Sequence, residues 1–178
     1  MRTHAKHAPA ALIGLAGVLL LAGCVMPVDR DPAGVDGSDG SDGSNAAGGR
    51  QQVSCAETSS ITLEGQRVRY DVEGDCAEVI VRGDDLTVRL NATTALSIEG
   101  QDNDIESRAE LGAVTINGND NDVEARTIAS ITISGRDNDL EAATVGSVEI
   151  SGEDNSIEAD NDPQPVRING NGNTVERR

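Results

Sequence analysis

The sequence of 178 residues contains no tryptophan, no phenylalanine and a single tyrosine, Tyr70. Aromatic faces are what single-stranded nucleic acids stack on, and carbohydrate clefts use them in the same way. The formal net charge of −17 adds a second exclusion, because a strongly acidic surface repels phosphate backbones. We therefore expect no nucleic-acid partner.

Histidine and lysine occur only within the first seven residues, as His4, His7 and Lys6. If that segment is removed from the mature protein, no residue remains for a histidine-dependent triad, a histidine-ligated zinc site, a Schiff base or a phosphate-binding lysine loop. These absences favour a protein without enzymatic activity.

The N-terminal segment has the features of an export signal. After Arg2 and Lys6, an apolar run from Ala11 to Leu21 leads into Leu-Ala-Gly-Cys at residues 21–24. The run is shorter than the ~20 residues that a spanning helix needs. It resembles a bacterial lipoprotein signal peptide, and the resemblance implies that residues 1–23 are removed and that Cys24 carries diacylglycerol. An ordinary secretory peptide is the alternative.

The resemblance also predicts a location. A lipid-modified Cys24 would hold the exported chain on the outer face of the bacterial cell membrane, since two or more acyl chains give stable anchoring. Loss of Arg2 and Lys6 would change the formal charge from −17 to −19. Residues 24–52, which include three Asp-Gly-Ser triplets at 36–44, read as a disordered Gly/Ser/Asp-rich tether with a reach of about 30 Å.

The remaining residues, 53–178, are built from an internal repeat. An apolar-x-apolar-x-Gly unit occurs seven times at intervals of 17 or 18 residues. The repeat glycines are Gly65, Gly83, Gly100, Gly118, Gly135, Gly152 and Gly170. Alternation of apolar residues with period two predicts short strands with one buried face. A unit this short cannot bury its faces alone, so we predict an all-β parallel β-helix or β-solenoid of about seven 17–18-residue coils.

Each corner of the predicted coil combines glycine with asparagine. We expect the glycines to supply positive φ angles there. Three residues after the glycine, five coils carry Asn103, Asn121, Asn138, Asn155 and Asn173. Stacked amides can hydrogen-bond from coil to coil, so we interpret them as a structural ladder. Val68 and Leu86 take this position in the first two coils, which confines the ladder to the last five.

The two other cysteines, Cys55 and Cys76, are 21 residues apart, which is close to one coil plus a corner. An exported chain folds in an oxidising compartment, so we predict a disulfide that clamps the N-terminal coil.

Acidic residues recur two, four and six positions after the glycine. The central rows are Asp102/Asp104/Glu106, Asp120/Asp122/Glu124 and Asp137/Asp139/Glu141. Because the third and fifth positions face inward, we expect these side chains to share one outward side. In-register like charges destabilise adjacent strands. Calcium, which binds carboxylate oxygens, is therefore a candidate cofactor at these rows. The alternative is a solvated face that keeps the rod soluble and unassociated.

The lipoprotein signal, the tether and coils such as Val-Thr-Ile-Asn-Gly-Asn-Asp-Asn-Asp-Val at 114–123 together resemble the domain of unknown function 3060 family of mycobacterial and related lipoproteins. The resemblance covers roughly residues 53–178. It implies no activity, substrate or site residue, because the family has no characterised function.

Three functions remain open. The first is a lipid-anchored, non-enzymatic structural or binding module for an unknown protein partner. The second is a calcium- or other cation-binding module that uses the acidic columns. The third is a polysaccharide lyase or hydrolase on a β-helix. Such enzymes build a groove from long insertions between coils, whereas every spacing here is 17 or 18 residues. We therefore expect a module without catalytic residues.

Overall fold

The computed structural model describes residues 49–55 and 59–178, and this part of the chain is all-β. Within it, no helix is long and apolar enough to cross a membrane. The predicted signal peptide, residues 1–23, the lipidation site Cys24 and most of the predicted tether lie outside the described residues.

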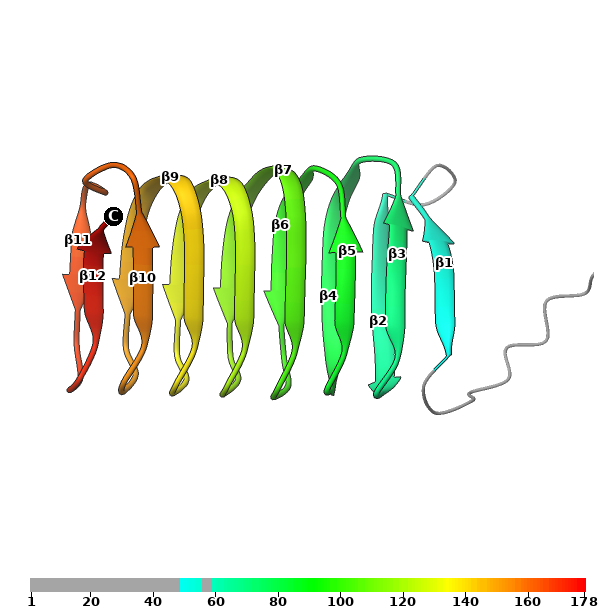
Figure 1. Cartoon of the computed structure of the whole chain (residues 1–178), viewed down its shortest axis with the longest axis horizontal. Helices are drawn as coiled ribbons and strands as arrows, with labels where there is room; N and C mark the ends of the chain where they lie inside the picture. Colours follow the sequence, from blue (N-terminus) through cyan, green and yellow to red (C-terminus); the bar gives the residue numbers. More distant parts are fainter. Residues whose placement is uncertain (1–48, 56–58) are drawn as a thin grey trace, which may run out of the picture. The chain divides into compact units, whose positions relative to one another are not determined.

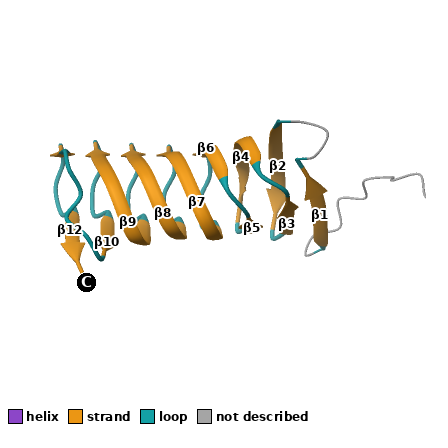
Figure 2. Cartoon of the chain, turned by 90° about the horizontal axis from the view of Figure 1, so that it is seen from above, coloured by secondary structure: helices purple, strands orange, loops and turns teal. Residues whose placement is uncertain are grey.

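Twelve parallel strands wind into one β-solenoid (Figure 1), as the repeat predicts. They are β1 (Arg50–Ser54), β2 (Ser60–Gln66), β3 (Arg69–Glu73), β4 (Cys76–Asp84), β5 (Thr87–Leu90), β6 (Thr93–Ile98), β7 (Asp104–Ile116), β8 (Asp122–Ile133), β9 (Asp139–Ile150), β10 (Ser156–Ala159), β11 (Val166–Ile168) and β12 (Thr174–Arg177). One face runs β1-β3-β5-β7-β8-β9-β10-β12. The other joins β2, β4 and β6 to the second halves of β7, β8 and β9 and then to β11. The three long strands bend from one face to the other (Figure 2).

The first strand starts earlier than the repeat indicates. Arg50 pairs with Arg69 and Val53 pairs with Val72, in parallel register between β1 and β3. Residues 50–52 therefore belong to the solenoid, and the predicted boundary between tether and solenoid at residues 52 and 53 is wrong by three residues. The repeat does not indicate β1 because this strand has no repeat glycine of its own.

The core consists of aliphatic columns that run along the stack. Ile105 on β7 pairs with Val123 on β8, and both side chains are 0% exposed. At the corner between the two faces, Leu111 and Ile128 form a further buried column. Each coil covers the apolar side chains of its neighbours, so the hydrophobic contribution to stability comes from stacking rather than from any one coil.

The repeat glycines have a different role from the one predicted. Only Gly65 and Gly170 have positive φ, at 133° and 130°. At the other five, a side chain would strike the previous coil; a Cβ added at Gly135, for example, would lie 1.6 Å from the carbonyl oxygen of Gly118. These glycines allow close approach between backbones. The prediction that each of them supplies the left-handed corner is wrong.

The left-handed corner belongs instead to the residue two positions after the glycine. The residues there are Arg67, Asp85, Asp102, Asp120, Asp137, Asp154 and Gly172, with φ between 54° and 70°. Aspartate tolerates this conformation better than most residues with a side chain, because its short polar group can hydrogen-bond locally. Backbone conformation therefore accounts for this acidic column.

The predicted disulfide is present. Cys55, which follows β1, is bonded to Cys76 at the start of β4, with their Cα atoms 5.4 Å apart. Both residues are buried, and the bond ties the first strand to the coil that follows.

Candidate functional site: the acidic face

The asparagine ladder lies inside the solenoid. Nδ2 of Asn121 donates to Oδ1 of Asn138 over 2.9 Å and to the carbonyl oxygen of Gly100 over 3.1 Å. The backbone N–H of Asn121 donates to the same Oδ1 over 3.2 Å. Asn103, Asn138 and Asn155 repeat this pattern, and the N–H of Leu86 starts the ladder by donating to Oδ1 of Asn103.

All four of these internal asparagines are 1% exposed. Their amides are fully used in coil-to-coil bonds, so they are part of the scaffold rather than a ligand site. Asn173 closes the ladder by donating to the carbonyl oxygen of Gly152 over 2.8 Å.

Six carboxylates on three strands form what we call the acidic face: Asp104 and Glu106 on β7, Asp122 and Glu124 on β8, and Asp139 and Glu141 on β9. The aspartates are direct register partners across the three strands, and so are the glutamates. Buried residues alternate with them along each strand, so the carboxylates point outward. Neighbouring strands lie about 4.8 Å apart, which sets the spacing between like charges.

The acidic face is narrower than the sequence predicts. Asp102, Asp120 and Asp137 lie in the left-handed corner before β7, β8 and β9 begin. All three are exposed and alternate with the buried asparagines, as expected, but the backbone turns at position two, so they stand at the corner and not on the strands that carry positions four and six. The face has two carboxylate columns rather than three.

Asp122 lies at the centre of the acidic face. Partial burial raises the pKa of its carboxyl group, and the neighbouring charges of Asp139, Asp104, Glu141 and Glu124 raise it further, in that order. The neighbours belong to three adjacent strands, so the repulsion follows directly from the register.

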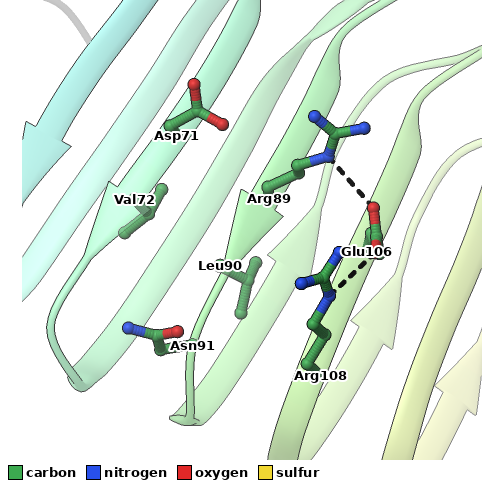
Figure 3. Close-up of a pocket in the computed structure, with 7 residues that line it drawn as sticks. All are labelled: Asp71, Val72, Arg89, Leu90, Asn91, Glu106 and Arg108. Atoms are coloured by element: carbon green, nitrogen blue, oxygen red, sulfur yellow. Dashed lines mark hydrogen bonds and ion pairs between the residues drawn. The ribbon is translucent and has the colours of Figure 1, made fainter.

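Arginines compensate only the edges of the acidic face. Glu106 pairs with Nε of Arg89 over 3.0 Å and with Nε of Arg108 over 3.4 Å (Figure 3). The hydrogen bond from Arg89 is the main cause that lowers the pKa of Glu106, with further contributions from Arg108. At the other edge, Glu141 pairs with Nη1 of Arg178 over 2.8 Å.

The interior carboxylates lack such partners. Among residues 49–55 and 59–178, no arginine lies within ion-pair distance of Asp104, Asp122, Glu124 or Asp139. A patch of four uncompensated carboxylates therefore spans β7 to β9. Such a patch attracts cations and cationic groups of a partner.

A shallow pocket borders the acidic face at Glu106, and its lining combines two carboxylates with two arginines. It encloses about 240 Å³ and is lined by Asp71, Val72, Arg89, Leu90, Asn91, Glu106 and Arg108 (Figure 3). Each of its charged groups has an ion-pair partner, because Glu106 pairs with both arginines of the pocket and Asp71 pairs with Nε of Arg50 over 2.9 Å. The acidic face thus ends at β7, and the neighbouring strand β5 presents Arg89 instead.

The acidic face holds no preformed metal cage. In the part of the chain that the structure describes, no three or more histidine, cysteine, aspartate or glutamate side chains converge in a group able to hold a metal ion. Calcium takes six to eight oxygen ligands. Carboxylates in straight columns present their oxygens in rows, so a bound cation would have to bridge neighbouring rows or recruit water.

Regular parallel coils, an internal amide ladder and aliphatic columns define this part of the chain as a parallel β-solenoid domain. The model of the family described as a protein of unknown function (DUF3060) matches residues 63–110 and, overlapping them, residues 98–144. This match over residues 63–144 confirms the resemblance of the repeat to that family. No curated protein and no solved structure matches the chain.

Proposed function

We propose that the chain is a lipid-anchored, non-enzymatic module on the outer face of a bacterial cell membrane, where its β-solenoid has a structural or binding role. The observation that carries this proposal is the continuity of strand pairing from β1 to β12. The longest described segment between neighbouring strands after β2, residues 160–165, is too short to wall a substrate cleft. A regular surface of paired strands with short connections suits contact with a partner rather than enclosure of a small molecule.

Support for the anchor comes from the sequence. Cys24 follows the Leu-Ala-Gly triplet that a lipoprotein signal requires, and the two other cysteines are bonded to each other. Cys24 is thus the one thiol of the chain left for acylation.

The chain's three cysteines allow a matched test of the anchor. The full-length chain and Cys24→Ala would be expressed in a bacterial host fed labelled palmitate, and membrane and soluble fractions compared. We expect the wild type to carry label and to be retained in the membrane fraction, and Cys24→Ala to carry no label. The matched control, Cys55→Ser with Cys76→Ser, should keep its label. An unlabelled wild-type chain would refute the anchor.

A second candidate function is cation binding at the acidic face. The raised pKa of Asp122 favours it, because a cation would relieve the same repulsion that opposes ionisation there.

Thermal melting tests cation binding. The melting temperature would be measured in chelator and then with increasing calcium, with magnesium as the reference. Specific binding predicts a saturable, calcium-selective rise that is lost in Asp122→Asn with Glu124→Gln. Asp137→Asn with Asp154→Asn, at the corner, should keep the rise; equal shallow responses to both cations would indicate charge screening alone.

A further inference from the structure

The last coil exposes apolar side chains whose counterparts on β4, β6, β7, β8 and β9 are buried. Val166 is 36% exposed and Ile168 is 46% exposed, and these are the exposed large hydrophobic residues of the described chain. Their register partners one coil earlier, Val148 and Ile150, are 2% and 1% exposed. In the described chain, β11 and β12 each pair on one side only. Unpaired strand edges beside apolar side chains are a template for pairing with another chain.

The opposite end of the solenoid is a poor match for this surface. There β1 adds a strand to the face of β3 only, so the two faces end at different levels. The ladder position at that end belongs to Gly49, whose carbonyl oxygen accepts from the N–H of Arg69, and glycine has no side-chain oxygen to accept from the donors of Asn173. Arg67 and Arg69 add positive charge, and the last coil already carries Arg177. Head-to-tail stacking of two copies is therefore disfavoured.

We propose that two copies of this chain associate through their last coils about a two-fold axis parallel to the strands, with β11 of each copy pairing antiparallel to β12 of the other. In Figure 1, β11 and β12 run in opposite directions within their coil. A two-fold axis along the strands keeps each direction and exchanges the two faces. It therefore places β11 beside β12 of the second copy with both inward sides facing the shared core.

The rise of the solenoid selects this crosswise arrangement. One coil advances by one strand spacing, about 4.8 Å, so β12 lies about half that distance beyond β11 along the stack. Pairing β11 with β11 and β12 with β12 would leave one pair too far apart when the other is in contact. In the crosswise arrangement, the distance from β11 to β12 of the second copy equals the distance from β12 to β11 of the second copy. Both strand pairs therefore reach hydrogen-bonding distance together.

The register of the contact follows from the corner. A Cβ built at Gly170 would lie 3.2 Å from Nδ2 of Asn173, so these two residues are level with each other. Ile168 and Val175 are each two residues from that corner and are therefore level as well. The two-fold axis places Ile168 opposite Val175 of the second copy, which covers both apolar side chains.

The same register brings opposite charges together. Arg167 lies next to Ile168 and faces outward in register with Glu149, while Glu176 lies next to Val175 in register with Glu158. Within the described residues, neither Arg167 nor Glu176 makes an ion pair of its own. In the dimer Arg167 lies opposite Glu176 of the second copy, and the symmetry creates this pair twice.

Cysteine cross-linking tests the contact in the full-length chain. Arg167→Cys and Glu176→Cys, introduced together, lie on opposite faces within one copy but opposite each other between copies. Oxidation of membranes that contain this variant should give a disulfide-linked dimer on a non-reducing gel. The matched control is Glu149→Cys with Glu158→Cys, one coil earlier on the same two faces, which should stay monomeric. The wild-type chain controls for Cys24.

Charge reversal tests the pairing by a second route. Sedimentation equilibrium of the detergent-solubilised full-length chain should show a dimer whose dissociation constant rises about tenfold in Arg167→Glu and in Glu176→Arg, since each change replaces two attractive pairs by two repulsive ones. The double reversal should restore dimerisation to near the wild-type value. Both sites are exposed, so unchanged melting curves would exclude misfolding as the cause.

Several results would overturn the proposal. These are a monomer at every concentration, equal cross-linking of the two cysteine pairs, a double reversal no better than the single variants, and a cross-linked band that contains a different protein. The last would assign the end of the solenoid to another partner. The proposed lipid anchor is independent of all four, because the palmitate labelling of Cys24 does not depend on association.

Discussion

Nδ2 of Asn121 donates to Oδ1 of Asn138 over 2.9 Å, and the backbone N–H of Asn121 donates to the same oxygen over 3.2 Å. One amide oxygen thus satisfies two donors of the coil before it. Both residues are 1% exposed, so water cannot take over if the acceptor is removed. The stability of each corner therefore depends on the side chain of the next coil.

Replacing Asn121 by leucine should unfold the middle of the stack more readily. The change removes the acceptor for two donors of Asn103 and the donor to Gly100. Unsatisfied buried groups cost about 1–3 kcal/mol each, so we expect a loss of about 3 kcal/mol in the free energy of unfolding. Urea unfolding measures it. Asn117→Leu, the same substitution at an exposed position of this coil, serves as the control. Equal losses of unfolding free energy in the two variants would contradict the ladder.

A methyl group at Gly135 should be at least as damaging for a different reason. The added Cβ would lie 1.6 Å from the carbonyl oxygen of Gly118, an atom of the backbone that cannot rotate away. We expect Gly135→Ala to cost about 2–3 kcal/mol through separation of the two coils. Ser134→Ala, its exposed neighbour, should have little effect on the urea midpoint. A tolerated Gly135→Ala would mean that the coils are not in such close contact.

The corner shows where prediction from sequence reaches its limit. Apolar alternation and a fixed period were sufficient to predict the strands of the seven repeats, the parallel stacking and the position of Asn121 inside, although not β1. They were not sufficient to assign the left-handed residue, since glycine and aspartate are both turn formers. Which of the two residues takes the left-handed conformation depends on the close contact between Gly135 and Gly118, and that contact exists only once the coils are stacked. Arg67 shows this most clearly, because its φ of 55° is imposed by the repeat against its own preference.

The acidic face was predicted in part for the same reason. Columns at a fixed offset from the glycine are visible in the sequence, and the register of Asp104, Asp122 and Asp139 follows from them. The place of Asp120 at the corner and not on β8 was not predictable, because the sequence does not reveal which corner residue takes the left-handed conformation. The compensation of Glu141 by Arg178, 37 residues away, has no local signal in the sequence.

Substitutions at Asp120 separate conformation from charge. Asp120 has a φ of 55°, so Asp120→Asn should keep the wild-type stability because asparagine also tolerates the left-handed region. Asp120→Val should lose about 1–2 kcal/mol, because a β-branched residue is strained there. Thermal melting of the two variants at neutral pH gives the comparison. If Asp120→Asn were as unstable as Asp120→Val, the carboxylate charge, and not the backbone conformation, would explain why aspartate occupies this position.

The disulfide should stabilise the N-terminal coil. Cys55 and Cys76 are separated by 21 residues, and closing a loop of that length contributes about 3 kcal/mol in the chain-entropy model. We expect the double change Cys55→Ser with Cys76→Ser to lower the urea midpoint. Hydrogen exchange should locate the loss in β1 to β4, while the amides of β8 and β9 keep their protection. A loss spread evenly over all coils would show that the stack unfolds as one unit.

Asp122 should make the stability of the solenoid depend on pH. Its pKa is higher in the folded chain than in the unfolded chain, so the folded state binds this proton more tightly. Ionisation therefore opposes folding: the cost is absent below the ordinary carboxyl pKa, develops as the pH rises through the folded pKa and is complete at neutral pH.

Asp122→Asn should accordingly raise the free energy of unfolding at neutral pH by about 0.2–1 kcal/mol, the range for like charges on neighbouring strands. The gain should vanish near about pH 3, where the native aspartate is protonated as well. Added salt should reduce the gain at neutral pH, since the carboxylates of Asp104 and Asp139 act through exposed solvent. Asp137→Asn, at the corner, removes a carboxylate without changing the acidic face and serves as the control. If the gain in the free energy of unfolding for Asp122→Asn stayed constant from acid to neutral pH, side-chain packing, and not repulsion within the acidic face, would be its cause.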